Sequence, residues 1–195
     1  MTEHQQAATA QWRPVHKFGG SSLADAAGFH RVANIINAQQ ADALIVVSAS
    51  GKTTNRLIEL LNLFISGDDA AAIVLEGIYS YQQQLICNVL SDDVAAPLLA
   101  ELERDISDIA SLLEHQKLDL YQRNKVQSYG EVWSARLLAH LLNSQGRGAT
   151  PIDARQFLQV SGTPVKVEHA YSSAHLNALL NQYQGQCLVI TGFIA

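Results

Sequence analysis

The chain has 195 residues, of which 48% are hydrophobic, and 13 Lys and Arg stand against 18 Asp and Glu, a net charge of −5. This composition excludes a disordered chain, and the absence of a basic run argues against nucleic acid as a partner. The longest strongly apolar runs, 44–47 and 187–190, are far shorter than the roughly 20 residues that cross a bilayer, so no membrane association is expected.

The N-terminal segment and the cysteines indicate a cytoplasmic protein. Residues 1–13 form a polar tail that lacks the charged start and apolar stretch of a signal peptide. Cys87 and Cys187 are flanked by apolar residues, and we expect both to be buried free thiols. The nearest histidines, His169 and His175, lack the spacing of metal ligands, so no structural metal is expected.

Beyond the tail, strand-like and helix-like segments alternate. This alternation predicts an α/β fold, a three-layer α/β/α sandwich with a mostly parallel sheet. The segment 44–47 is apolar throughout, which is typical of a central strand buried on both faces. The predicted strands are 15–18, 44–47, 149–152 and 187–191, and a short hairpin is expected around 162–165.

The predicted helices include one long excursion between two strands. A helix after the first strand has one apolar face, made by Phe29, Val32, Ala33 and Ile36. The excursion, 54–144, holds four helices, at roughly 54–66, 70–90, 94–116 and 121–144. Pro97 is expected in the first turn of its helix, Gly146 and Gly148 should end the excursion, and a helix over 172–184 follows.

The loop after the first strand, Lys17 to Ser22, is the first candidate site. Ligands of parallel sheets collect at the carboxyl ends of the strands. Two glycines before a helix N-terminus offer free N–H groups, and Lys17 adds a full charge, a combination that suits a phosphate. The compatible alternative is a tight turn in which Ser22 caps the helix and Asp25 completes a capping box.

The loop after the second strand, Ser48 to Asn55, is the second candidate. It contains Gly-Lys-Thr, but the position where a P-loop needs its first glycine is Val46, so a P-loop is excluded. Its hydroxyls suit a small polar ligand, while the pattern alone favours a turn in which Thr53 or Thr54 starts a helix. The hydroxyls are those of Ser48, Ser50, Thr53 and Thr54.

Glu131 is the third candidate. It is expected at or near the start of a helical segment, where the helix dipole stabilises a carboxylate by roughly 0.3–1 kcal/mol. Alternatively, Gly130 presents Glu131 to a cavity, where the carboxylate would hold an ammonium group. Trp133, Leu137 and Leu141 repeat every four residues and are interpreted as core.

Four segments in this order resemble the aspartokinases of the amino-acid kinase family. They are Lys17 to Ser22, Val47 to Ser50 followed by Thr54-Asn55, Gly130-Glu131, and Thr191 to Ile194. The stretches HKFGGSSLAD, GEVWSARLL and DARQFL are most similar to the type II bifunctional aspartokinases of methionine biosynthesis, which carry a homoserine dehydrogenase downstream. The resemblance covers the chain after its tail, so residues 14–195 are interpreted as the N-terminal portion of an aspartokinase catalytic domain.

The resemblance implies transfer of the γ-phosphoryl group of ATP, bound with Mg²⁺, to the side-chain carboxylate of L-aspartate. The product, 4-phospho-L-aspartate, begins the pathway to methionine, threonine and lysine. Lys17 would neutralise the transferred group as the catalytic residue, and Gly19, Gly20 and Ser21 would bind phosphate oxygens. Ser48, Thr54 and Glu131 would hold aspartate, Phe193 would line the substrate pocket, and Lys52 is assigned no role.

The last predicted strand stops at Gly192 to Ala195 without a closing helix, so the chain reads as a fragment. Members of the family continue with segments that bind the nucleotide, so we expect this chain to be inactive alone. Because strand edges would be exposed, we also expect it to form a homo-oligomer. Three alternatives stay open. One is another amino-acid kinase, of the glutamate or carbamate class, and another is a noncatalytic module that binds aspartate. The third is a fragment that folds but binds nothing.

Overall fold

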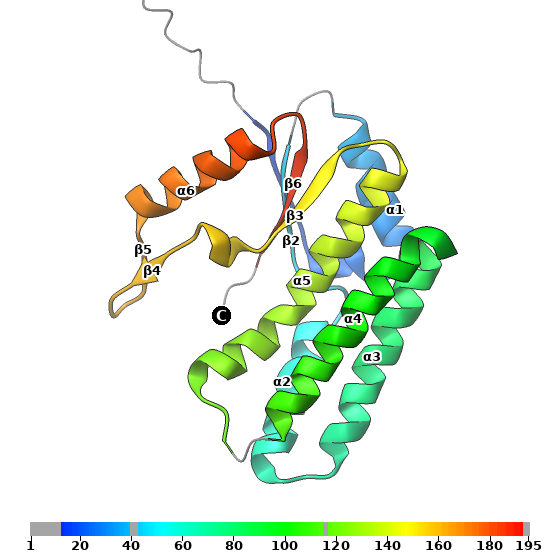
Figure 1. The fold of residues 1–195 in the computed structure, drawn as a ribbon, viewed down its shortest axis with the longest axis vertical. Helices are drawn as coiled ribbons and strands as arrows, with labels where there is room; N and C mark the ends of the chain where they lie inside the picture. Colours follow the sequence, from blue (N-terminus) through cyan, green and yellow to red (C-terminus); the bar gives the residue numbers. More distant parts are fainter. Residues whose placement is uncertain (1–12, 40–42, 115–116, 193–195) are drawn as a thin grey trace, which may run out of the picture.

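The computed structural model describes residues 13–39, 43–114 and 117–192, and its centre is a parallel sheet (Figure 1). The strands are β1 (Val15–Phe18), β2 (Leu44–Val47), β3 (Ala149–Ile152) and β6 (Cys187–Thr191), in the order β1-β2-β6-β3. All three neighbouring pairs are parallel, so the four carboxyl ends lie along one edge of the sheet. The four predicted strands are confirmed.

Alternating side chains of the strands divide the core into two layers. Ile45, Val47 and Val189 pack on the side of α1 (Ala26–Asn37) and α5 (Leu120–Ser144). Val46, Leu188 and Ile190 pack on the opposite side, against α6 (His169–Gln182). Burying apolar side chains on both faces stabilises the central strands β2 and β6. The expected three-layer sandwich is therefore confirmed.

The long excursion between β2 and β3 is a bundle beside the sheet (Figure 1). Its helices are α2 (Thr53–Ser66), α3 (Ala70–Val89), α4 (Asp92–Leu113) and α5. Each turns a stripe of aliphatic side chains inward, for example Leu57 of α2, Ile78 of α3 and Leu102 of α4. Gly67 ends α2 in a left-handed conformation, with φ 70°, which glycine adopts without strain.

Several details differ from the sequence-based expectations. Because α4 begins at Asp92, Pro97 lies in its second turn and removes one backbone donor from the helix. Cys87 is exposed and only Cys187 is buried, since the helix turns Cys87 away from the core. The last helix runs from His169, three residues earlier than expected. The expected hairpin is present as β4 (Val160–Ser161) and β5 (Lys166–Val167).

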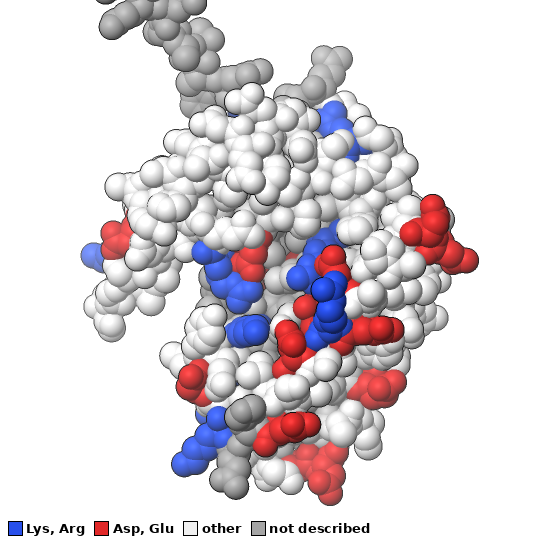
Figure 2. All heavy atoms as spheres, in the orientation of Figure 1, with Lys and Arg blue, Asp and Glu red and all other residues white. Residues whose placement is uncertain are grey.

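Charge is mixed over the face seen in Figure 2, where acidic side chains spread over the helical bundle and basic ones lie beside acidic ones near its centre.

Within the part of the chain that the structure describes, no helix is both long and apolar enough to cross a membrane. In the same ranges, no three His, Cys, Asp or Glu side chains gather as a metal site would require.

Candidate functional site

The loops that follow β1 and β2 are joined by backbone hydrogen bonds at the carboxyl edge of the sheet. The amide of Ser48 donates to the carbonyl of Phe18 at 3.0 Å, and the amide of Gly51 donates to the carbonyl of Gly20 at 3.0 Å. A Cβ on Gly20 would lie 2.6 Å from the carbonyl oxygen of Ala49. Glycine is therefore required at position 20, because the two loops touch through their backbones.

Helix α5 packs against the second loop through Gly130. A Cβ there would lie 2.7 Å from the Cβ of Ala49 and 3.3 Å from the Cγ2 of Thr53. This close approach brings the next residue, Glu131, to the loop. Its Oε1 accepts a hydrogen bond from the amide of Ala49 at 3.2 Å and another from the hydroxyl of Thr54 at 3.3 Å.

The carboxylate of Glu131 is buried and only half satisfied. The residue is 2% exposed, and its Oε2 has no hydrogen-bond partner. None of the ion pairs among the described residues includes Glu131. Burial raises the pKa of this carboxyl above its ordinary value, against the hydrogen bonds from Ala49 and Thr54, which lower it. A buried carboxylate without a counter-charge is a strong acceptor for a cationic group.

Glu131 lies in the middle of α5, not at a helix start. The expectation of a dipole-stabilised residue at a helix N-terminus is therefore wrong, because α5 begins at Leu120 under a capping box made by Asp119 and Gln122. The glycine that precedes Glu131 permits packing on Ala49 and does not break the helix. Trp133, Leu137 and Leu141 are buried, as predicted for core.

A cavity of about 330 Å³ opens between the two loops and α5. Polar and apolar atoms line the cavity in similar measure, and Glu131 is among its lining residues. Its volume matches a small polar metabolite better than a large cofactor. The lining residues are Gly20, Ser48, Ala49, Gly51, Lys52, Thr54, Asn55 and Glu131.

Gly20 lines this cavity on the β1 side, and Lys17 and Gly19, which precede it in the chain, do not line it. Lys17 is exposed on an edge strand, and its Nζ lies 3.6 Å from the point where a Cβ on Gly19 would stand. The chain then forms a short 3-10 turn, η1 (Gly20–Leu23), before α1. Ser21 is exposed in that turn and does not line the cavity.

The cap of α1 corrects one expectation. Asp25, not Ser22, is the N-cap, because Ser22 is taken up by the 3-10 turn. The Asp25 carboxylate accepts a hydrogen bond from the amide of Gly28 at 2.7 Å. A carboxylate therefore already occupies the positive end of α1, and the donors left for an anion on this side are those of the glycine turn and Lys17.

Of the residues predicted from sequence, the structure gathers Gly20, Ser48, Thr54 and Glu131 around one cavity, and Lys17, Gly19 and Ser21 are not among its lining residues. Phe193 lies outside the described residues. Sequence reasoning missed the amide of Ala49 as a partner of Glu131, and it assigned no role to Lys52, which lines the cavity. The amide of Ala49 could not be found from the sequence, because every residue but proline carries a backbone amide. Lys52 could have been considered, because it lies in the loop that the sequence already identified as a candidate site.

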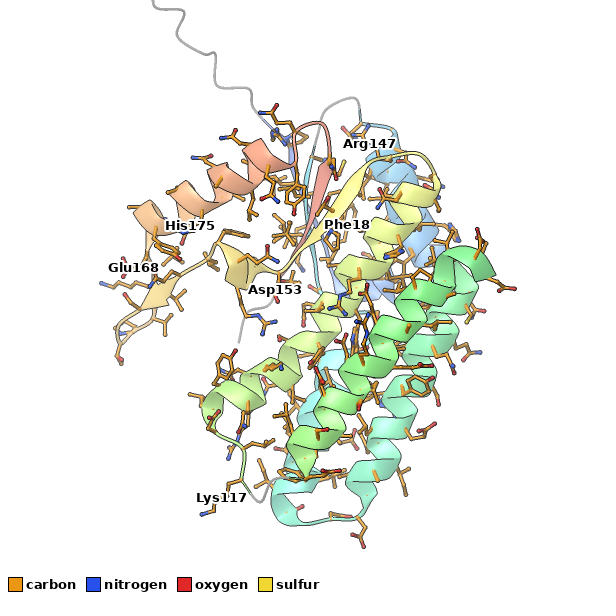
Figure 3. The ribbon with its side chains drawn as sticks, in the orientation of Figure 1. Phe18, Lys117, Arg147, Asp153, Glu168 and His175 are labelled. Atoms are coloured by element: carbon orange, nitrogen blue, oxygen red, sulfur yellow. The ribbon has the colours of Figure 1, made fainter. Side chains whose placement is uncertain are left out.

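The neighbouring strand ends carry satisfied side chains. Thr191 accepts a hydrogen bond from the amide of Ala154 at 2.9 Å, which ties β6 to the turn after β3. Asp153, labelled in Figure 3 with Phe18 at the end of β1, forms an ion pair with Arg155. Burial alone would raise the pKa of Asp153, but the hydrogen bonds from Arg155 lower it below its ordinary value.

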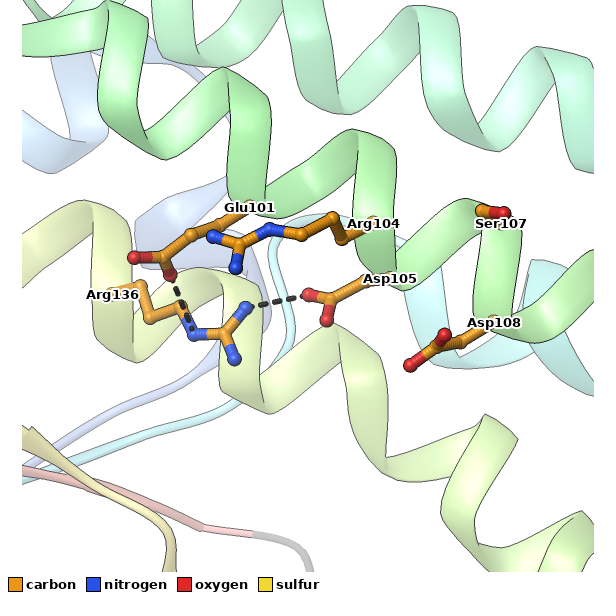
Figure 4. Close-up of a pocket in the computed structure, with 6 residues that line it drawn as sticks. All are labelled: Glu101, Arg104, Asp105, Ser107, Asp108 and Arg136. Carbon is orange, nitrogen blue, oxygen red and sulfur yellow. Dashed lines mark hydrogen bonds and ion pairs between the residues drawn. The ribbon is translucent and has the colours of Figure 1, made fainter.

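A second pocket, of about 510 Å³, lies between α4 and α5, away from the strand ends. Figure 4 shows Arg136 reaching from α5 to two acidic residues of α4. Its guanidinium lies 3.3 Å from a carboxylate oxygen of Glu101 and 2.5 Å from one of Asp105. Asp105 also accepts a hydrogen bond from the indole N–H of Trp133 at 2.9 Å. Because Arg136, Glu101 and Asp105 already pair with one another, this pocket is a weaker candidate than the strand-end cavity.

Comparison with known proteins gives consistent results. Residues 12–195 match the profile of the amino acid kinase family. The chain is 40% identical over 190 residues to the bifunctional aspartokinase/homoserine dehydrogenase 2 of Escherichia coli, covering 96% of this chain and 23% of that protein. It is 33% identical over 151 residues to aspartokinase 1 of Arabidopsis thaliana, covering 72% of this chain and 25% of that protein.

Solved structures agree on the fold. A crystal structure of E. coli aspartokinase III in complex with aspartate and ADP matches with a TM-score of 0.81 and 24% identity, covering 93% of this chain and 41% of that one. At this sequence identity, the match shows only that the two chains share a fold. The chain thus spans between a fifth and a half of the relatives described, 23% of the bifunctional E. coli protein and 41% of aspartokinase III.

Proposed function

Because the chain belongs to the amino acid kinase family, we propose that it forms the part of an aspartokinase site that binds L-aspartate and phosphate. The reaction is transfer of the γ-phosphoryl group of ATP to the side-chain carboxylate of L-aspartate, which yields 4-phospho-L-aspartate and ADP. The observation that carries this proposal is the buried Glu131 carboxylate, which lies at a small cavity, forms no ion pair and has one oxygen without a hydrogen-bond partner.

In this proposal Glu131 binds the ammonium group of aspartate. A substrate ammonium supplies both the missing positive charge and the donor that Oε2 lacks. The hydroxyls of Ser48 and Thr54 line the same cavity and orient the ligand by hydrogen bonds. Phe193 is proposed as a further lining residue of the substrate pocket.

The chemical step follows from charge. The aspartate carboxylate is already ionised at neutral pH, so one of its oxygens attacks the γ-phosphorus without a general base. The bond from that phosphorus to the β–γ bridging oxygen breaks, and its electron pair leaves with ADP. Catalysis then depends on bringing two anions together, which Lys17 favours by charge and Gly19, Gly20 and Ser21 favour by donating hydrogen bonds.

The donor is proposed to be ATP as its Mg²⁺ complex, a substrate and not a resident group of this chain. The aspartate and ADP in the structure of E. coli aspartokinase III support this choice. We further propose a cytoplasmic homo-oligomer. Two free cysteines fit a reducing compartment, and β1 is an edge strand whose Val15 is 63% exposed.

The proposal is tested by trapping the acyl phosphate with hydroxylamine and measuring aspartyl hydroxamate. The assay uses the chain itself and a hybrid in which it replaces the segment that it matches in the bifunctional E. coli relative. The hybrid should form hydroxamate from L-aspartate, and Lys17→Ala in the hybrid should abolish the product.

Two outcomes would contradict the proposal. Preference of a folded hybrid for L-glutamate would point to another amino-acid kinase. Saturable binding of L-aspartate without ATP-dependent product would point to a noncatalytic binding module.

A further inference from the structure

Helix α3 carries a buried glutamine that contacts the second loop of the site. Gln82 is 2% exposed, and its neighbours on the same face of α3 are the buried aliphatic residues Ile78, Leu85 and Ile86. Its Nε2 donates to the hydroxyl oxygen of Ser50 at 3.2 Å and to that of Thr53 at 3.0 Å. A buried amide in an aliphatic stripe costs desolvation energy unless its hydrogen bonds are made, so its place is determined by these partners.

These bonds fix the turn of the second loop. The Thr53 hydroxyl donates to the carbonyl of Ser50 at 2.7 Å and accepts from Gln82, so its rotamer is determined by two partners. The residues that flank this pair, Ala49 and Thr54, are the two that donate to Glu131. The loop is therefore held from one helix by Gln82 and from another by Glu131, and movement on the Gln82 side would displace the donors of Glu131.

The residue before Gln82 holds the first loop. The hydroxyl of Tyr81 donates to the carbonyl of Ala24, directly after η1, at 3.0 Å. The same oxygen lies 3.0 Å from the point where a Cβ on Gly51 would stand, so Tyr81 also touches the second loop. Two consecutive residues of α3, which lies beside α2 in Figure 1, thus reach both loops.

We propose that Gln82 and Tyr81 are positioning residues, Gln82 for the loop that binds the amino acid and Tyr81 for the glycine turn that binds phosphate. Neither residue lines the cavity, so neither is a catalytic residue. The assignment of the loops to these ligands rests on the proposed function. The claim that Gln82 holds the second loop in place is independent of the proposed function.

The claim that Gln82 holds the second loop in place is tested on the chain itself by amide hydrogen exchange. Gln82→Met keeps the volume of the side chain and removes its donors, and the matched control is Gln84→Met, on an exposed position of the same helix. In Gln82→Met the amides of Gly51 and Thr53 should exchange about tenfold faster, with little change elsewhere. Unchanged exchange at these amides, or an equal rise throughout the chain, would overturn the proposal.

The assignment to ligands is tested in the hybrid by steady-state kinetics. Gln82→Met should raise the KM for aspartate about tenfold and leave the KM for ATP within about twofold, and Tyr81→Phe should raise the KM for ATP more than that for aspartate. A purely structural role predicts equal losses for both substrates. If the parent hybrid forms no hydroxamate, the proposed function fails, while the exchange experiment still decides whether Gln82 holds the loop.

Discussion

Two buried carboxylates, one on α5 and one on the neighbouring helix α4, differ in their partners. Asp105 of α4 is 9% exposed, and it accepts hydrogen bonds from Trp133 and Arg136 of α5. Glu131 is 2% exposed and receives only one backbone amide and one hydroxyl, and none of the ion pairs among the described residues includes it. Burial raises the pKa of both, and only at Asp105 does an arginine oppose it. Burial of a carboxylate therefore does not by itself identify a binding site, whereas burial of a carboxylate that forms no ion pair does.

The largest effect is expected for Glu131→Gln in the hybrid. The amide keeps an acceptor for Ala49 but removes the negative charge that the substrate ammonium requires. Losing one partner of a buried charged pair costs about 3 kcal/mol, so the KM for aspartate should rise about 100-fold. The measurement is hydroxamate formation against aspartate concentration. A rise below about threefold would show that Glu131 does not bind the substrate.

The converse effect is expected at the paired carboxylate. Asp105→Ala removes the acceptor of the Trp133 indole and one of the two carboxylates at Arg136. Because Arg136 is partly exposed, we expect a loss of about 2 kcal/mol in the free energy of unfolding, below the cost of a fully buried pair. Urea denaturation of the chain measures this loss. A stable variant whose hybrid shows a higher KM for aspartate would reverse the roles assigned to the two carboxylates.

A smaller effect is expected where α5 touches the loop. Gly130→Ala favours the helix but places a methyl group 2.7 Å from the Cβ of Ala49. Since helix propensity and overpacking oppose each other, the free energy of unfolding should change by less than about 1 kcal/mol. The KM for aspartate should rise about tenfold, because the donors of Glu131 move with the loop. Gly148→Ala, with no atom closer than 3.5 Å to the added Cβ, is the control, and equal kinetics in both variants would contradict the expectation.

The smallest effect is a dependence on pH. Ammonium binding needs ionised Glu131, and burial raises the pKa of this carboxyl, so aspartate affinity should begin to fall at a higher pH than an ordinary glutamate would give. The contribution of Glu131 to the free energy of unfolding changes with pH in the opposite direction to the aspartate affinity. A raised pKa in the folded chain makes a contribution that is present below the unfolded pKa and is lost as pH rises through the folded pKa.

The pH experiment compares the parent hybrid with Glu131→Gln between about pH 5 and 8. The parent should show a rise of the aspartate KM of a few-fold toward the acidic end, and the variant should not. Identical pH profiles would mean that Glu131 does not titrate in the site.

The sheet and its layers could be predicted from the sequence because they depend on local patterns. The apolar run 44–47 and the spacing of Phe29, Val32 and Ile36 specify a strand and a helix without knowledge of distant residues. The boundaries were harder to predict. A serine or an aspartate can cap the first helix, and only the intervening 3-10 turn determines that Asp25 does so.

The site could be predicted in part. The candidate residues followed from strand ends and from a resemblance, but the place of Glu131 inside its helix depends on contact with Ala49, 82 residues earlier. Gln82 was missed although it left a signal, a polar residue in an aliphatic stripe. Such a residue indicates a buried partner without telling which one, because the partner lies on another element of the fold.

The proposed function depends on the unpaired Glu131 carboxylate binding the ammonium group of the substrate. The most direct test compares L-aspartate with succinate, which is aspartate without its amino group, in the parent hybrid and in Glu131→Gln. The parent should favour aspartate by about 100-fold in kcat/KM, and the variant should show almost no preference. A variant that keeps the full preference would show that another group recognises the ammonium, which would contradict the proposed role of Glu131.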